Sequence, residues 1–313
     1  MDSKIDIAII GECLIELSAN GTLADTSTLN KYFGGDTVTT AVAIARLGGN
    51  VTYLTKVGND GFSEFIISSL QKENIDTSLI KSNEEQNGMY IVSRTPESRE
   101  LLYYKRKTAA AKLSIEDITE ECIKKLKLVY STGVVQSLSA SSRELVRETF
   151  RIAKENGVLT AYDPNYTSCF MNSADTKEYF EEIVDYTDVI FLSLKNDAAR
   201  LYEVDSMDKV MKYFWDKGVK IVVVKSHIDN GYYTGYKGEI SFTEFYNTSK
   251  AIDVTASGDV FNGGFLYALT NGYTPSEAMK FAAVVAGLQT QNYGAIQAIP
   301  YKDAAVSYTH LRA

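Results

Sequence analysis

The feature that most constrains how this chain can fold is a regular alternation of short apolar runs with longer amphipathic stretches. Short strands that alternate with helices of about 10–15 residues predict βαβ units around a parallel sheet. We therefore expect an α/β fold of three layers, built as one domain over residues 1–305. The expected strands are residues 5–10, 51–54, 127–130, 158–162, 188–192 and 219–224, and the expected helices are 36–47, 61–73, 142–156 and 177–186.

One segment departs from this alternation. Residues 88–94 and 100–106 each resemble a strand, and the turn-forming run Thr95-Pro96-Glu97-Ser98-Arg99 lies between them. This pattern predicts a β-hairpin inside a chain of βαβ units. Residues 13–18 and 30–33 could supply neighbouring strands. We expect a small sheet, drawn from about residues 12–34 and 88–107, that acts as a lid over a ligand cleft.

The composition excludes several classes of protein. A net charge of -8 argues against general nucleic-acid binding, although one local site could still bind an anion. No apolar run reaches the roughly 18 residues that span a bilayer, and the polar start lacks an apolar signal segment. Three distant cysteines and two histidines predict neither a disulfide framework nor a zinc site. We expect a cytoplasmic protein with neither a nucleic-acid nor a membrane partner.

The last residues, 306–313, follow a natural-looking end at residues 299–303 and resemble a translated adaptor sequence. A native C-terminus that frays is the alternative. We expect a non-native or disordered tail there and do not use it to infer the fold.

The most informative segment is the run Asp253-Val254-Thr255-Ala256-Ser257-Gly258-Asp259, called here the transfer turn. Small residues before a helix leave its first N–H groups open, and these donors favour an anion. A carboxylate at such a place repels the anion unless it has a task, such as accepting a proton from an attacking hydroxyl. The alternative is that Asp259 only caps the following helix. The run matches neither GxxxxGK[ST] nor GxGxxG, which argues against a P-loop protein and a simple dinucleotide-binding fold.

A second glycine turn, Phe33-Gly34-Gly35-Asp36, precedes the expected helix at residues 36–47. Alone it would be read as an ordinary tight turn. Two glycine-rich turns that each open a helix, at opposite ends of an α/β chain, are less expected by chance, and the second turn strengthens the functional interpretation of the first.

These two regions resemble the signature regions of the ribokinase (PfkB) family of carbohydrate kinases, and within it the 2-keto-3-deoxygluconate kinases. The resemblance spans about residues 5 to 300. Its supporting stretches are Gly11-Glu12-Cys13-Leu14-Ile15-Glu16-Leu17-Ser18, Phe33-Gly34-Gly35-Asp36-Thr37, Tyr103-Tyr104-Lys105-Arg106, Val222-Val223-Val224-Lys225 and Tyr293-Gly294-Ala295.

The resemblance implies a three-layer ribokinase-like fold and an ATP-dependent sugar kinase. Asp259 would deprotonate the sugar hydroxyl, and the amides of Ala256, Ser257 and Gly258 would hold the charge on the transferring phosphoryl group. Mg²⁺ would bridge phosphate oxygens, and its protein ligands stay unknown. Family likeness also implies a possible homodimer through the lid sheet.

For the sugar, the resemblance implies contacts from both glycines of the second turn and from the lid hairpin. Tyr104 and Arg106 are two residues apart and would face one side of a strand, where the guanidinium could pair with a sugar carboxylate. The alternative is that Lys105-Arg106-Lys107 is a solvated strand edge. The expected sugar contacts are Gly34, Gly35, Tyr90, Tyr104, Arg106 and Asp259.

For ATP, the resemblance implies a site along the carboxyl ends of the later strands. Lys225 ends the apolar run 221–224, where α/β sheets bind ligands, although an ordinary polar strand end would look the same. The expected ATP contacts are Asn165, Ser193, Lys225, Gly231, Gly258, Asn292 and Gly294.

Three positions depart from the family pattern. Thr39 and Thr167 stand where the subgroup has an asparagine and a sugar-binding arginine, and residues 193–197 lack the full Asn-x-x-Glu pattern. The expected substrate is an acid sugar such as 2-keto-3-deoxygluconate. A neutral ketose or hexose such as fructose is the alternative substrate, and a non-catalytic sugar- or nucleotide-binding protein is the alternative function.

Overall fold

The computed structural model describes residues 5–95, 99–246 and 251–309. In this part of the chain the main sheet has nine strands in the order β13-β12-β11-β10-β9-β8-β1-β4-β5. Neighbours from β11 to β5 are parallel, and β12 and β13 add an antiparallel edge. The strands are β1 (Ile7–Ile10), β4 (Val51–Val57), β5 (Ile80–Ser82), β8 (Leu128–Thr132), β9 (Leu159–Asp163), β10 (Val189–Ser193), β11 (Ile221–Ser226), β12 (Gly231–Tyr236) and β13 (Glu239–Glu244).

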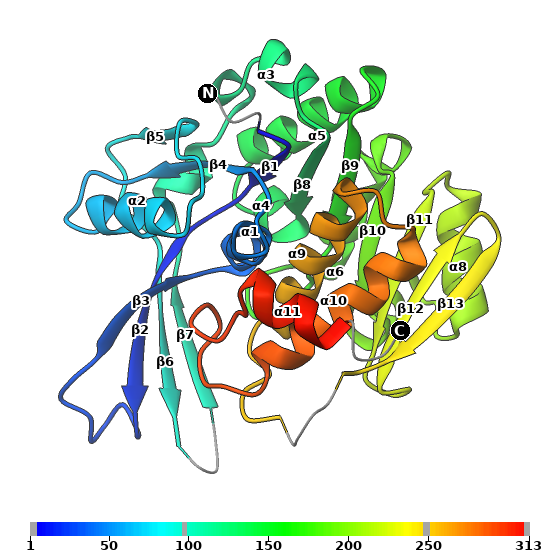
Figure 1. The fold of residues 1–313 in the computed structure, drawn as a ribbon. Helices are drawn as coiled ribbons and strands as arrows, with labels where there is room; N and C mark the ends of the chain where they lie inside the picture. The colour runs from blue at the N-terminus through cyan, green and yellow to red at the C-terminus, as the bar shows by residue number, and fades with distance from the viewer. Residues whose placement is uncertain (1–4, 96–98, 247–250, 310–313) are drawn as a thin grey trace.

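Helices cover both faces of this sheet, which confirms the expected three layers (Figure 1). Along β1, Ile7 and Ile9 join one hydrophobic cluster, whereas Ala8 and Ile10 join the other, because successive side chains of a strand point to opposite faces. One face carries α1 (Asp36–Arg46), α2 (Ser63–Lys72), α9 (Ser257–Thr270), α10 (Pro275–Gln289) and α11 (Lys302–Thr309). The other carries α3 (Glu120–Lys124), α4 (Gly133–Gln136), α5 (Ala140–Glu155), α6 (Ser173–Glu181), α7 (Ala199–Tyr202) and α8 (Met207–Asp216).

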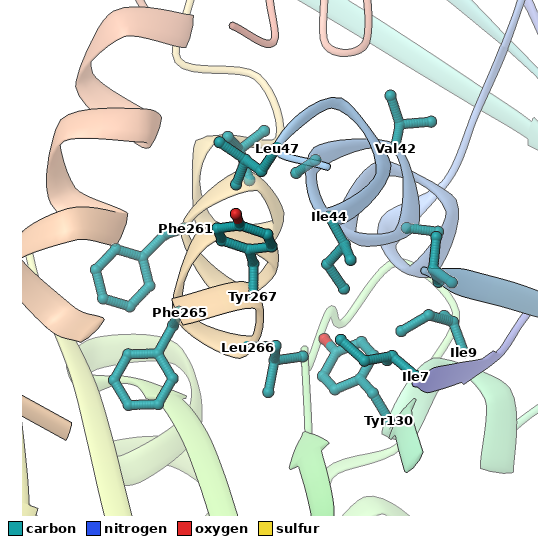
Figure 2. Packing of buried hydrophobic residues seen from close by; sticks show 14 of the residues in the cluster. Ile7, Ile9, Val42, Ile44, Leu47, Tyr130, Phe261, Phe265, Leu266 and Tyr267 are labelled. Carbon is teal, nitrogen blue, oxygen red and sulfur yellow. The ribbon is translucent and has the colours of Figure 1, made fainter. Parts of the chain in front are cut away.

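The two glycine turns come together because the helices that follow them pack against each other. Figure 2 shows α1 and α9 side by side, with Ile44 and Leu266 among the side chains between them and the sheet. Gly263 permits this close approach: a Cβ there would lie 2.6 Å from Ala43 Cβ and 2.7 Å from the carbonyl oxygen of Thr40. Turns that are more than 200 residues apart in the sequence, at Gly35 and Asp259, therefore open onto the same region.

We expect Gly263→Ala to lower the free energy of unfolding by about 1–3 kcal/mol, because the added methyl group overpacks the contact between α1 and α9. Urea denaturation monitored by circular dichroism measures this loss. Gly61→Ala is the control, since a Cβ at Gly61 meets nothing within 4 Å. Equal stability of the two variants would contradict the assigned packing.

The lid is a separate sheet that extends from one end of the main sheet (Figure 1). Its strands are β2 (Leu14–Asn20), β3 (Asn30–Gly34), β6 (Met89–Arg94) and β7 (Arg99–Tyr104), in the order β3-β2-β6-β7. The four strands lie at the segments that the sequence indicates, except that β7 ends at Tyr104 rather than at residue 106. The middle of the expected hairpin turn, residues 96–98, lies outside the described residues.

The C-terminal segment contains the last helix of the described chain. Helix α11 (Lys302–Thr309) extends through residues 306–309, and its residue Ala305 is fully buried. Residues 310–313 lie outside the described part of the chain. Among the described helices, none has the length and apolar character needed to cross a membrane.

Candidate active site

A cavity of about 250 Å³ lies between the lid and the carboxyl ends of the main strands. The chain runs outward from β1 in both directions, to β4 and β5 on one side and to β8 and the later strands on the other. In open α/β sheets, ligands bind at the carboxyl ends of the strands where the strand order reverses. This central cavity is lined by Gly35, Tyr90, Asn165, Ala256 and Asp259, five of the residues expected from the sequence.

Asp259 lies in the first turn of α9, is half-buried and lines the cavity. Its Oδ1 accepts a hydrogen bond from Asn165 Nδ2 at 3.3 Å, and the same amide group donates to Asp36 Oδ2 at 3.3 Å. Burial raises the pKa of Asp259 well above its ordinary value, and the nearby carboxylate of Asp36 raises it further. A carboxylate with a raised pKa is a stronger proton acceptor, as a general base requires.

The backbone of the transfer turn offers free donors beside this carboxylate. Ala256 adopts a left-handed conformation, with φ 59° and ψ 14°, immediately before α9. Ser257 N donates to the carbonyl of Val254 at 3.2 Å, whereas the amides of Ala256 and Gly258 donate to no acceptor among the described residues. Two free N–H groups at the start of a 14-residue helix suit an anion. The structure thus leaves free only two of the three expected donors.

Lys225 provides a buried positive charge next to this turn. A Cβ at Gly258 would lie 3.6 Å from Lys225 Nζ, and the ammonium group donates to Asp163 Oδ2 at 2.8 Å. Burial lowers the pKa of an ammonium group, but the carboxylates of Asp163 and Asp259 hold the pKa of Lys225 above its usual value. Asn262 completes the arrangement by donating to Asp163 Oδ2 at 2.7 Å. Lys225 is therefore fixed and charged beside the free amides.

Asp197 was not among the expected site residues. It lies in the π-helix η4 (Leu194–Ala198), directly after β10, and its carboxylate accepts hydrogen bonds from the amides of Ser193 (2.6 Å) and Tyr166 (2.9 Å). Burial, together with the negative charge of Asp163, raises the pKa of Asp197 to about 7. Asp197 therefore ties the segment after β9 to the segment after β10. The only signal was the departure of residues 193–197 from the family pattern.

On the lid side, Tyr104 and Arg106 do not line the central cavity. Both line a different cavity, of about 410 Å³, together with Glu84 and Glu85. In the lid, Tyr103 is the direct partner of Tyr90 across β6 and β7, and directly opposed residues point to the same face. Since Tyr90 lines the central cavity, its partner Tyr103 lines it too.

Lys105 is the cationic side chain that the lid presents to the central cavity. Its Nζ lies 3.3 Å from Glu12 Oε2 and 4.2 Å from the centre of the Phe170 ring. Phe170 also packs edge-on against Tyr103, with ring centres 5.3 Å apart. Lys105 is therefore held between an acidic and an aromatic side chain at the cavity wall.

The remaining expected residues do not line this cavity. Gly34 lies behind the wall, where a Cβ would meet the Tyr90 hydroxyl at 2.4 Å. Ser193 ends β10 and Gly231 begins β12. Asn292 is exposed in the turn after α10, and Gly294 borders a further cavity of about 600 Å³ between this turn and the lid.

Comparison with known proteins agrees with this arrangement. The family described as pfkB family carbohydrate kinase matches residues 4–302. A 2-dehydro-3-deoxygluconokinase of Dickeya dadantii is 32% identical, over 93% of this chain and 96% of the relative. An ATP-dependent 6-phosphofructokinase of Thermoanaerobacterium thermosaccharolyticum is 27% identical, over 99% of this chain and 96% of the relative.

A solved structure shares the fold across the whole length. The putative ribokinase II of Escherichia coli in complex with ATP and Mg²⁺ has a TM-score of 0.89 at 22% identity, over 98% of this chain and 100% of that chain. The family match covers nearly all of the sequence, including both glycine turns and the lid. The chain belongs to the pfkB family of carbohydrate kinases.

Proposed function

We propose that this kinase transfers the γ-phosphate of ATP to a hydroxyl of a small acid sugar, such as 2-keto-3-deoxygluconate, with Asp259 as general base. The observation that carries the proposal is that Asp259 and Ala256, whose amide is free, line the same cavity. Relatives named 2-dehydro-3-deoxygluconokinase, at 32% and 33% identity, support the choice of sugar.

The arrangement fits the demands of phosphoryl transfer, which needs alignment and charge stabilisation more than covalent chemistry. Asp259 accepts the proton of the attacking hydroxyl, and the amides of Ala256 and Gly258 bind the phosphoryl oxygens. Lys225 adds a fixed positive charge next to Gly258. The lid covers the sugar side of the cavity, where Tyr90 and Tyr103 present aromatic surface.

The substrate side carries one cation suited to a carboxylate. Lys105 lines the cavity, whereas Thr167, which stands where the family resemblance implies an arginine, contributes only a hydroxyl there. With one cation instead of two to pair with a sugar carboxylate, the cavity should favour acid sugars over neutral sugars less strongly. A neutral ketose or hexose such as fructose is therefore the second candidate substrate, favoured by Thr167.

ATP would bind along the carboxyl ends of β10 and β11, next to Lys225 and Gly258. Among the described residues there is no cluster of three or more His, Cys, Asp or Glu side chains that could hold a metal ion. Asp163 and Asp197, two carboxylates that interact with Lys225, already accept hydrogen bonds from Lys225 and from backbone amides. This arrangement fits a Mg²⁺ ion that would be held mainly by the nucleotide phosphates and would keep several of its waters. When bound, Mg²⁺ neutralises phosphate charge.

The pH dependence of kcat/KM tests the role of Asp259. The carboxylate must be ionised to accept a proton, so activity falls as the pH drops through its raised pKa. Asp36→Asn removes a negative charge that raises this pKa, and the acid limb of the profile should move to lower pH. Asp25→Asn, an exposed change in the lid, is the control and should leave the limb in place. An unmoved limb in Asp36→Asn would contradict the proposed coupling.

An ADP-release assay over a panel of sugars tests the proposed function as a whole. The panel contains 2-keto-3-deoxygluconate, gluconate, fructose and glucose, each with ATP and Mg²⁺. We expect the highest kcat/KM with 2-keto-3-deoxygluconate. A preference for fructose would support the second candidate, and ADP release with none of these sugars would contradict both.

A further inference from the structure

The transfer turn is anchored from behind by the C-terminal end of α10. The amides of Ile252 and Asp253 donate to the carbonyl of Thr290, at 2.8 and 3.3 Å. Gln289, the last residue of α10, is fully buried, and its Nε2 donates to the carbonyl of Thr255 at 3.0 Å. The same amide group lies 3.5 Å from the carbonyl of Gly294. Only a donor such as the NH₂ group suits a position between two carbonyl oxygens.

The hydrogen bond from Gln289 fixes the orientation of the peptide group between Thr255 and Ala256, whose N–H is one of the two free donors of the transfer turn. The chain contains no cis peptide bond among its described residues, so the C=O of Thr255 and the N–H of Ala256 point in opposite directions from one planar group. The carbonyl points back toward Gln289, behind the turn. The N–H of Ala256 therefore points away from α10, and both Thr255 and Ala256 line the central cavity.

This orientation is not one that the local backbone would keep unaided. Ala256 has a φ of 59°, in the left-handed region that costs a non-glycine residue conformational energy. Asp253 supports the turn from the other side: its Oδ1 accepts from Thr255 N at 2.9 Å and its Oδ2 from Gly294 N at 3.1 Å. Gln289 and Asp253 thus hold Thr255 and Gly294 from both directions. Gln289 Oε1 has no hydrogen-bond partner among the described residues, so the NH₂ group accounts for all its polar contacts.

We propose that Gln289 is a positioning residue for phosphoryl transfer: by holding the carbonyl of Thr255, it keeps the Ala256 N–H directed at the phosphoryl group. This inference rests on the proposed function of the transfer turn. It assigns to a buried residue of α10, which does not line the central cavity, control over a donor that acts in the transition state.

The first test replaces the donor by an apolar side chain of similar length. Gln289→Met should lower kcat by about 10- to 100-fold, which is at most the effect of removing an oxyanion-hole donor outright. The KM for the sugar should stay within about twofold of the wild-type value. Gln136→Met is the matched control. Gln136 is also buried and donates through Nε2 to a backbone carbonyl, that of Tyr179, at 3.0 Å; its Oε1 accepts from the Tyr162 hydroxyl at 2.7 Å, and neither partner belongs to the transfer turn. Rates are compared per folded molecule, with the folded fraction taken from thermal unfolding.

The second test uses Gln289→Glu, which keeps the shape and makes the donor depend on protonation. The protonated carboxyl can donate to Thr255 O, whereas the ionised form repels that carbonyl. The ratio of its kcat to that of the wild type should therefore rise as the pH falls. A purely structural role would predict a constant ratio, and it would predict equal kcat per folded molecule for Gln289→Met and Gln136→Met. Either result would overturn the inference.

The role of Gln289 and the role of Asp259 can be disproved independently of each other. If Asp259→Asn abolishes turnover but Gln289→Met keeps full kcat, only the role of Gln289 is wrong. If Asp259→Asn itself keeps full kcat, the proposed base is wrong, whatever Gln289→Met does.

Discussion

Replacement of Asp259 by asparagine is expected to lower kcat by about a thousandfold or more, because it removes the proton acceptor beside the attacking hydroxyl. Asparagine is close to isosteric with aspartate and can still accept the hydrogen bond from Asn165 that the carboxylate accepts at 3.3 Å. The free amides of Ala256 and Gly258 and the cation of Lys225 stay in place, so ATP should bind with nearly unchanged affinity. Steady-state ADP release and isothermal titration with ATP measure the two quantities.

The same variant should unfold at a higher temperature than the wild type at neutral pH. Burial and the charge of Asp36 raise the pKa of Asp259 in the folded state. At any pH above the pKa that Asp259 has in the unfolded chain, the unfolded state therefore loses this proton more readily than the folded state, which lowers the stability of the fold. Asparagine carries no charge and removes this cost. A variant that is inactive because it is misfolded would instead melt at a lower temperature, and one that is both stable and fully active would contradict the assigned base.

The second large effect is expected at Lys105. Lys105→Met should lower kcat/KM for acid sugars by about 30-fold or more and leave neutral sugars within about threefold, since truncation of a buried charge pair costs several kcal/mol. Methionine keeps a side chain of similar length over the Phe170 ring, which Lys105 Nζ contacts at 4.2 Å from its centre. The panel of acid and neutral sugars gives the comparison directly.

Two controls sharpen this result. Lys105→Arg keeps the charge and should retain the preference for acid sugars, which separates lost charge from lost packing against Glu12. Arg106→Ala removes the neighbouring cation that borders the other cavity and should have little effect. Equal losses on acid and neutral sugars in Lys105→Met would remove Lys105 from carboxylate recognition. A loss of activity on acid sugars alone in Arg106→Ala would instead support Arg106 as the residue that binds the sugar carboxylate.

The arrangement of the fold could be predicted because it follows from local patterns. Each strand expected in the parallel sheet is present, since runs such as 221–224 are apolar on both faces and require helices on either side. The lid was predictable from its break in the βαβ rhythm. The two glycine turns were predictable as a pair, although their contact depends on the packing of α1 against α9 at Gly263.

The register of the lid was not predictable in the same way. In the expected strand 100–106, Tyr104 and Arg106 would share one face, but only pairing with β6 decides which face lines the central cavity. The observed strand β7 (Arg99–Tyr104) pairs Tyr103 with Tyr90, which lines this cavity, and Lys105, just after the strand, lines it too. A prediction from one strand without its partner had an even chance of choosing the wrong face.

The hairpin of β12 and β13 escaped prediction because its turn lacks the usual residues. Lys237 and Gly238 both have positive φ, 51° and 81°, as a two-residue hairpin turn requires, but Asn or Asp is the common first residue there. The alternating run before it, Tyr232-Tyr233-Thr234-Gly235-Tyr236, was the available signal. Gln289 gave no local signal, because its role depends on a contact with Thr255, 34 positions away. For Asp197 the departure of residues 193–197 from the family pattern was the available signal, but it did not reveal the contact with Tyr166, 31 positions away.

The central claim is that this chain moves a phosphoryl group from ATP to a sugar, with Asp259 as the base. The most direct measurement is the fate of label in a single turnover with ATP labelled at the γ-phosphate, followed by separation of products. With 2-keto-3-deoxygluconate, the wild type should place the label on the sugar, and Asp259→Asn should leave it on ATP. Label released as inorganic phosphate, or transferred at the wild-type rate by Asp259→Asn, would contradict the account.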